Sequence, residues 1–161
     1  MWRYYRHAIF AKIRKIMIEK RRESLRDIAV KYLWSFLGTP YKWGGDDPNA
    51  MDCSGLIMEI LQAVGLIDRK SDYTASALFE LFKGYKTDRG SKGCLVFFRG
   101  QNEQICHIEM CINDELMIGA SGGGRFVKTI EDAVKYNAFV KIRPVKRAGL
   151  VGFIDPFLVI N

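Results

Sequence analysis

Residues 38–65 read GTPYKWGGDDPNAMDCSGLIMEILQAVG, and this stretch predicts a loop that leads directly into a helix. Pro40 disfavours helical backbone angles in the residue before it, so any preceding helix ends there. From Cys53 onward, apolar residues recur at the spacing of one helical face. These are Leu56, Ile57, Ile60, Leu61 and Val64. With Asp52 as N-cap and Gly65 as terminator, Cys53 is expected in the first turn of a buried helix.

The position of Cys53 has a chemical meaning. Free backbone N–H groups and the positive end of the helix dipole stabilise a thiolate in the first turn. A thiolate is the nucleophilic form of cysteine. Because a cysteine at a helix start is more often a structural residue, the position alone does not assign a catalytic role.

Two strings around Cys53 are more specific. PYKWGG at 40–45 and DCSG at 52–55 resemble the signature of the NlpC-type cell-wall cysteine peptidases, a papain-like group. The resemblance runs from about Ala29 to Pro144 and is weakest in the middle. It implies an α+β papain-like fold, with the nucleophile at a helix N-terminus packed on an antiparallel sheet.

Length and composition fit one soluble globular domain, with 161 residues, 48% of them hydrophobic and 27% charged. No apolar run approaches the roughly 20 residues that a membrane span needs. Lys12, Arg14 and Lys15 interrupt the apolar core of any signal peptide. We therefore expect a protein made in the cytoplasm that reaches the bacterial wall by delivery, as a phage virion component, a lysis protein or an effector.

The net charge of +7 favours anionic partners, namely nucleic acid, anionic lipid or the acidic polymers of a wall. The sequence contains no zinc-finger or RNA-binding signature, so no specific nucleic-acid partner is expected. The charge itself does not choose between lipid and wall polymer.

The chain has four cysteines, Cys53, Cys94, Cys106 and Cys111. If Cys53 is free, the odd number left cannot pair completely, and a single histidine among them makes a poor zinc set. We predict buried, reduced thiols, with no metal and no cofactor.

Residues 1–23 are predicted to form a basic amphipathic helix, and residues 24–161 the peptidase domain. Within residues 2–22, one helical face carries Trp2, Tyr5, Ile9, Ile13, Ile16 and Met17. Basic residues cover much of the remainder. The segment is either a helix that packs on the domain with a solvated basic face, or a docking helix for a protein partner or an anionic surface.

Helices are expected first and strands second. A capping box at 24–27 predicts the start of a second helix, and further helices are predicted at about 53–64 and 73–83. Strands are predicted at 94–99, 105–112, 115–120, 126–129 and 138–143, with a short helix between the last two. The apolar residues 149–161 are expected to pack against the core. This order predicts an α+β fold.

A cysteine nucleophile needs a base, and the chain has two histidines. His7 lies in the basic N-terminal segment, where a docking or surface role is expected. By the resemblance, the base starts the strand that follows a segment matching Gly93–Phe98, and His107 has that place. We predict Cys53 and His107 as the catalytic pair.

The resemblance puts a third polar group on the following strand, where this chain has Gly119. A glycine has no side chain to orient an imidazole. Glu109 lies two residues from His107 and so faces the same side of its strand. Glu109 is the predicted orienting group, although it could instead be an ordinary carboxylate at the rim. Ser121 is another candidate, and a dyad without a third group stays open.

The resemblance also implies substrate-binding residues. Tyr41 would line the cleft, and Asp52 and Ser54 would help bind the free amino end of a stem peptide. Asp52 is equally suited to cap the helix. Two positions depart from the family pattern: Cys94 stands where an aspartate is usual, and residues 72–76 lack the usual Leu-Pro-Arg.

These observations predict a cysteine peptidase that hydrolyses an amide bond in the stem peptides of bacterial peptidoglycan, next to D-glutamate. Two other classes stay open. The chain could be a weakly active or inactive structural or wall-binding module of a virion, which Gly119 makes conceivable. It could also be a thiol amidase or acyltransferase on a non-wall substrate, because the same pair serves any acyl transfer.

Overall fold

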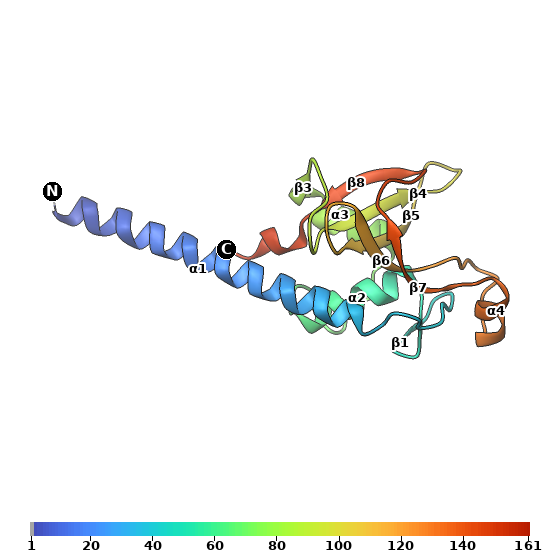
Figure 1. Ribbon diagram of the computed structural model, residues 1–161. Coiled ribbons are helices and arrows are strands. Elements are labelled where there is room, and N and C mark those ends of the chain that lie inside the picture. Colours follow the sequence, from blue (N-terminus) through green and yellow to red (C-terminus); the bar gives the residue numbers. More distant parts are fainter. Residues whose placement is uncertain (1) are drawn as a thin grey trace.

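The computed structural model describes residues 2–161, with side chains from residue 7 onward, and it confirms the α+β class. Its centre is a six-stranded antiparallel sheet in the order β3-β8-β4-β5-β6-β7 (Figure 1). The strands are β3 (Lys86–Thr87), β4 (Leu95–Arg99), β5 (Ile105–Cys111), β6 (Leu116–Ser121), β7 (Phe139–Pro144) and β8 (Leu150–Ile154). A small hairpin, β1 (Asp46–Asp47) and β2 (Ala50–Met51), precedes the sheet in the chain.

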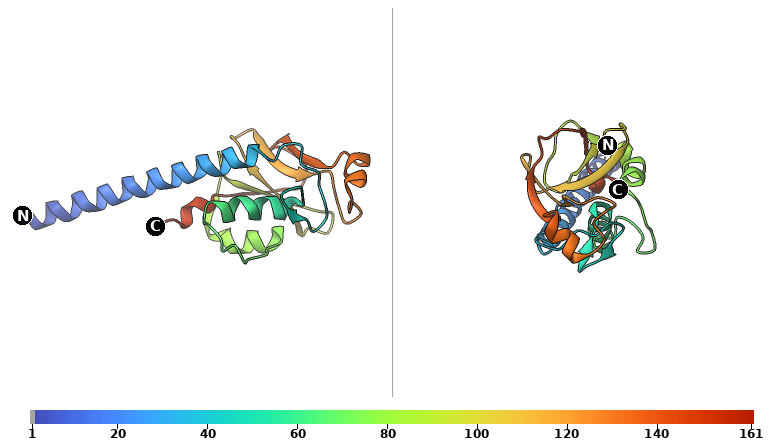
Figure 2. Two further views of the ribbon diagram at one scale, coloured as in Figure 1. Left: turned by 90° about the horizontal axis from the view of Figure 1, so that it is seen from below. Right: turned by 90° about the vertical axis from the view of Figure 1, so that its right-hand side faces the viewer.

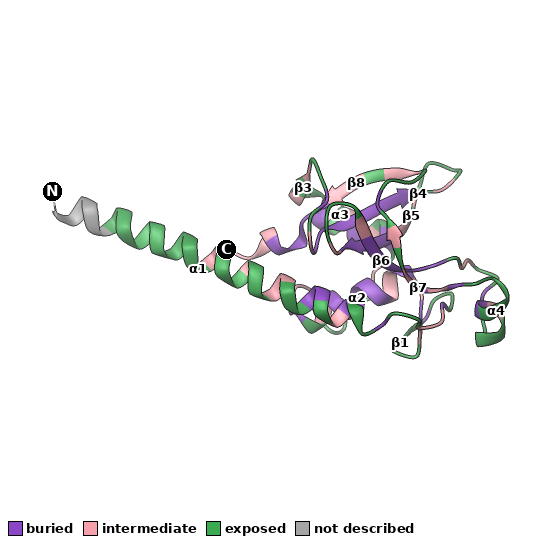
Figure 3. Ribbon diagram, in the orientation of Figure 1, coloured by how far each residue is buried: buried purple, intermediate pink, exposed green. Residues whose placement is uncertain are grey.

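Two helices, α2 (Cys53–Ala63) and α3 (Ala75–Phe82), pack on one face of the sheet (Figures 1 and 2). Alternation along β4 sends Leu95 and Phe97 into the main core, which includes residues of both helices, and Val96 and Phe98 into a smaller cluster. The smaller cluster therefore lies on the opposite face of the sheet. Figure 3 shows that the buried residues concentrate in α2 and the central strands.

The long helix α1 (Trp2–Trp34) corrects the predicted break at residues 24–27. Ser24 lies inside a continuous helix and caps nothing, because the residues on both sides are good helix formers without glycine or proline. The second half of α1 packs against α2 and the short 3-10 helix η2 (Pro156–Val159), whereas its first half projects away from the domain (Figures 1 and 2).

The predicted strand at 126–129 is also wrong. A turn joins Val127 N–H to the carbonyl of Gly124, and Asp132 accepts from the backbone of Lys128 and Thr129 in a capping box. These bonds commit the segment to a turn and to the start of α4 (Ile130–Lys135) rather than to a strand.

The apolar C-terminal residues pack against the core, as expected, but their first part forms a strand that the sequence did not indicate. This strand, β8, pairs with both β3 and β4 and so lies inside the sheet. The remaining predicted strands and helices are present with small shifts at their ends, and the 3-10 helix η1 (Lys83–Tyr85) extends α3. No helix in the described part of the chain has the length and apolar character needed to cross a bilayer.

Candidate active site

Cys53 is the first residue of α2, as predicted, and Asp52 is its N-cap. The Asp52 carboxylate accepts from Gly55 N–H at 2.8 Å and from Gly44 N–H at 3.0 Å. The same carboxylate accepts a 2.9 Å hydrogen bond from the Ser54 hydroxyl. Asp52 therefore joins the preceding loop to the start of the helix and fixes the position of Cys53.

An open cleft brings several of the predicted site residues together. Cys53 from the helix and His107 from β5 both line it, as do Tyr41 and Ser121. Its other lining residues are Trp43, Phe98, Arg99, Cys106, Gly122, Gly123, Arg143, Arg147 and Ala148. The Sγ atom of Cys53 lies 4.0 Å from the carbonyl oxygen of Cys106, the residue directly before His107. Asp52 and Ser54 flank the nucleophile position without lining the cleft.

Glu109 makes the contact with His107 that the strand spacing predicted. Its Oε1 atom lies 2.7 Å from Nε2 of His107. The Glu109 side chain is 0% exposed, so the interpretation as a rim carboxylate is wrong. Because Nε2 faces Glu109, Nδ1 is the ring nitrogen left to exchange a proton.

Two arginines complete this contact, and the sequence analysis missed both. Arg143 Nη2 donates to Glu109 Oε1 and lies 3.0 Å from His107 Nε2, and Arg147 Nη1 lies 3.4 Å from the same Glu109 oxygen. The Arg147 guanidinium also stacks over the ring of Phe98. A glutamate within an otherwise apolar strand indicates that a cation must accompany it, but nothing in the sequence says which one.

His107 and Arg143 favour the ionised form of Glu109. Burial alone would raise its pKa, but the hydrogen bonds and charges of His107 and Arg143 outweigh burial and hold the pKa of Glu109 below its ordinary value. A buried carboxylate that stays charged can fix the tautomer and orientation of the neighbouring imidazole.

The surroundings of Cys53 oppose the formation of a thiolate. Burial raises the pKa of the Cys53 thiol to about 12, and the nearby Asp52 carboxylate adds to the increase. Hydrogen bonding from the backbone of Ile108 and Ser54 acts in the opposite direction without compensating. Burial and the Asp52 charge therefore both favour the protonated thiol, and a base is needed to take its proton.

Gly119 has a clear structural consequence at this site. A Cβ atom at this position would lie 2.2 Å from Glu109 Cγ and 2.7 Å from its Cδ. The pairing of Met110 with Ile118 puts Gly119 directly opposite Glu109 when it is continued by one residue. The Glu109 side chain thus fills the space beside Gly119.

Other predicted residues differ in their surroundings. Burial raises the pKa of the Tyr41 phenol, which therefore stays protonated in the cleft. The Ser121 hydroxyl is buried and makes no hydrogen bond within the described structure.

All four cysteines are free, but Cys106 is exposed at the cleft, which corrects the expectation that it is buried. Its place at the open start of β5 explains the exposure.

His7 lies near the N-terminal end of α1 and does not line the cleft. Among the described side chains, those of residues 7–161, no three His, Cys, Asp or Glu gather to hold a metal ion.

Known proteins of one family resemble this chain. The sequence profile of the NlpC/P60 family matches residues 38–144. The chain is 33% identical over 106 residues to dipeptidyl-peptidase 6 of Lysinibacillus sphaericus, covering 65% of this chain and 35% of that one. It is 28% identical over 106 residues to the murein DD-endopeptidase MepH of Escherichia coli (strain K12), covering 63% and 35%. The match thus spans about a third of each of these relatives.

Solved structures show the same fold. The P60 domain of an antigen from M. avium subspecies paratuberculosis has a TM-score of 0.63 at 22% identity, covering 87% of this chain and 98% of that one. An NlpC/P60 family protein from Bacillus cereus has a TM-score of 0.62 at 23% identity, covering 80% and 39%.

Proposed function

Because the chain belongs to the NlpC/P60 family, we propose that it is a cysteine peptidase that hydrolyses an amide bond in the stem peptides of bacterial peptidoglycan. The observation that carries this proposal is the 2.7 Å contact between Glu109 and His107 in a cleft that also holds Cys53. A buried, ionised carboxylate that orients a histidine beside a helix-start cysteine is an arrangement suited to acyl transfer.

The wall substrate is supported by the relatives. The names of two similar proteins specify a murein endopeptidase and a probable peptidoglycan endopeptidase, the latter 27% identical over 99 residues. The proposal has three finer parts. The bond cut lies next to D-glutamate, and the protein is delivered by a phage particle. The side chains of Tyr41, Asp52 and Ser54 contact the stem peptide.

The proposed reaction starts from the thiol. His107 Nδ1 takes the proton of Cys53 as Sγ attacks the scissile carbonyl carbon, and this requires an approach of roughly 3–4 Å between the two atoms. Burial raises the pKa of this thiol, which is why the proposed reaction needs His107 to take the proton. Glu109 stabilises the imidazolium that forms.

The tetrahedral oxyanion is held by backbone N–H groups at the start of α2, where the helix dipole is also favourable. The C–N bond then breaks, and His107 returns its proton to the leaving amine. Water, deprotonated by His107, next attacks the thioester, which releases the carboxylic acid and restores the Cys53 thiol.

Digestion of purified peptidoglycan and of soluble muropeptides tests this proposal. The wild-type chain should release fragments with a new amine and a new carboxylate, identified by mass spectrometry. Cys53→Ala should release none while keeping its thermal transition. Cys94→Ala removes a buried thiol from the face of the sheet opposite α2, and it should remain active.

Other outcomes would assign the chain differently. A folded wild-type protein that binds peptidoglycan but releases nothing from any wall substrate would be a wall-binding module. Turnover confined to non-wall amides or acyl donors would identify a thiol amidase or acyltransferase.

A further inference from the structure

The positive charge of this protein is concentrated in one segment. Residues 2–22 contain eight lysines and arginines and one glutamate, and this excess equals the net charge of +7 of the whole chain. Residues 23–161 are therefore balanced. The excess positive charge that would attract an anionic partner over a long range therefore lies in residues 2–22.

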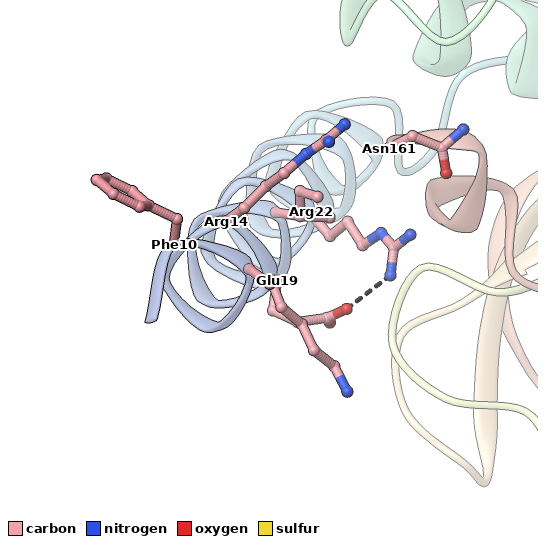
Figure 4. A pocket seen from close by; sticks show the side chains of 8 residues that line it. Phe10, Arg14, Glu19, Arg22 and Asn161 are labelled. Atoms are coloured by element: carbon pink, nitrogen blue, oxygen red, sulfur yellow. Dashed lines mark hydrogen bonds and ion pairs between the residues drawn. The ribbon is translucent and has the colours of Figure 1, made fainter. Parts of the chain in front are cut away.

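The same segment has an uncovered apolar face. Five apolar side chains between residues 9 and 17 are exposed, and Phe10 and Met17 are 64% and 66% exposed. The other three are Ile9, Ile13 and Ile16. At 3.6 residues per turn these five occupy roughly 120° of the helix surface. In Figure 4, Phe10 points away from the rest of the domain.

Basic residues border this face on both sides. On a helical wheel Lys12 lies just beyond Ile16 at one edge, and Arg14 and Arg21 lie just beyond Phe10 at the other. All three are exposed. An apolar strip between two basic borders is the pattern of a helix that lies in the plane of a membrane interface.

Two arginines farther along α1 fix its direction. Arg22 donates to the carbonyl of Ile160 at 2.7 Å, and Arg26 forms a two-point ion pair with Asp155 at 2.9 and 3.1 Å. Figure 4 shows Arg22 on the side of the helix toward the C-terminal Asn161. The helix is therefore anchored to the domain from Arg22 onward, and residues 7–21 project from that anchor.

We propose that residues 7–21 dock the domain on an anionic lipid bilayer, with Ile9, Phe10, Ile13, Ile16 and Met17 at the acyl boundary and the flanking basic residues at the headgroups. The five apolar side chains of the strip are exposed to water, so burying them against the acyl region is favourable. A second copy of the chain would bring basic borders together. An acidic wall polymer would neutralise the charge and leave the apolar strip in water.

Co-sedimentation of the full-length chain with vesicles tests this assignment. Vesicles of phosphatidylcholine with phosphatidylglycerol should bind the chain, and vesicles of phosphatidylcholine alone should bind it at least about tenfold more weakly. Added salt should weaken binding to the anionic vesicles, because screening acts on the basic borders.

Two double variants separate the contribution of the apolar strip from that of its basic borders. One replaces the apolar residues, Phe10→Ser with Met17→Ser, and the other replaces the basic borders, Lys12→Gln with Arg14→Gln. Each should lower binding to the anionic vesicles about tenfold or more. Val134→Ser, which removes an equally exposed apolar side chain from α4, should leave binding unchanged. All variants should keep the thermal transition of the domain.

Three results would overturn the proposal. The first is equal binding to neutral and anionic vesicles. The second is no vesicle binding together with a dimer, seen by light scattering, that Phe10→Ser with Met17→Ser dissociates. The third is binding to a purified anionic wall polymer that depends on Lys12 and Arg14 but not on Phe10 and Met17, with no binding to vesicles.

Discussion

Glu109 and Gly119 face each other across β5 and β6, and the carboxylate side chain occupies the space that any side chain on Gly119 would need. Glu109 reaches His107 from this position. The family resemblance puts the third polar group at position 119. In this chain Glu109 fills that part of the site from the neighbouring strand.

Gly119→Ala should therefore damage both stability and turnover. Its Cβ atom would lie 2.2 Å from Glu109 Cγ, and overpacking of this kind costs about 1–3 kcal/mol. Denaturant unfolding measures the cost. In a Glu109→Ala background the same substitution should cost much less, because the clashing side chain is gone. Equal costs in both backgrounds would show that the two residues are not coupled.

Glu109→Gln should reduce turnover of a soluble muropeptide by about ten- to a thousandfold without abolishing it, because the oxyanion donors remain. The neutral amide loses the charge that stabilises the imidazolium. Steady-state kinetics should place the loss in kcat. A variant with wild-type kcat would leave a Cys53–His107 dyad as the functional unit.

The same carboxylate predicts a pH dependence of stability. The pKa of Glu109 is held below its ordinary value of 4.5 in the folded protein. The ionised form therefore stabilises the fold at pH values above about 4.5, and this contribution is lost as the pH falls through the lower folded-state pKa. Thermal melts of wild type and Glu109→Gln between about pH 7 and pH 3 should show the wild-type advantage shrinking toward acid. A constant difference across that range would contradict the assigned direction.

The rate of alkylation of Cys53, but not of the other thiols, should depend on His107. Cys53 is buried with a raised pKa, so its reaction with iodoacetamide needs the base, whereas Cys106 is exposed. His107→Ala should slow labelling of Cys53 at least about tenfold and leave Cys106 unchanged. Peptide mass spectrometry measures the labelling of Cys53 and Cys106 in one sample. Cys94 is buried in the fold and serves as the unreactive reference. Unchanged labelling of Cys53 would exclude His107 as its base.

Removal of residues 1–21 should spare the chemistry. None of residues 7–21 lines the cleft, and the anchoring contacts of α1 begin at Arg22. Turnover of a soluble muropeptide should stay within about twofold of wild type, because surface changes away from the core usually have small effects. A folded deletion variant without activity on this small substrate would show that the helix contributes to catalysis.

The sequence alone predicted the fold class, the helix that starts at Cys53, its Asp52 cap and the hairpin that carries His107. These are local features, determined by hydrophobic periodicity, capping chemistry and turn residues within a few positions of one another. The two-residue spacing also predicted the contact of Glu109 with His107, because alternate residues of a strand share a face. The catalytic roles stay predictions.

Only the tertiary structure determined what surrounds those residues. Arg143 and Arg147 reach Glu109 from 34 and 38 positions away, and β8 enters the sheet from the C-terminal residues. Burial of Cys53 by the packed domain raises the pKa of its thiol. Charge neutralisation and desolvation depend on which distant segments pack together, and no local pattern specifies that packing.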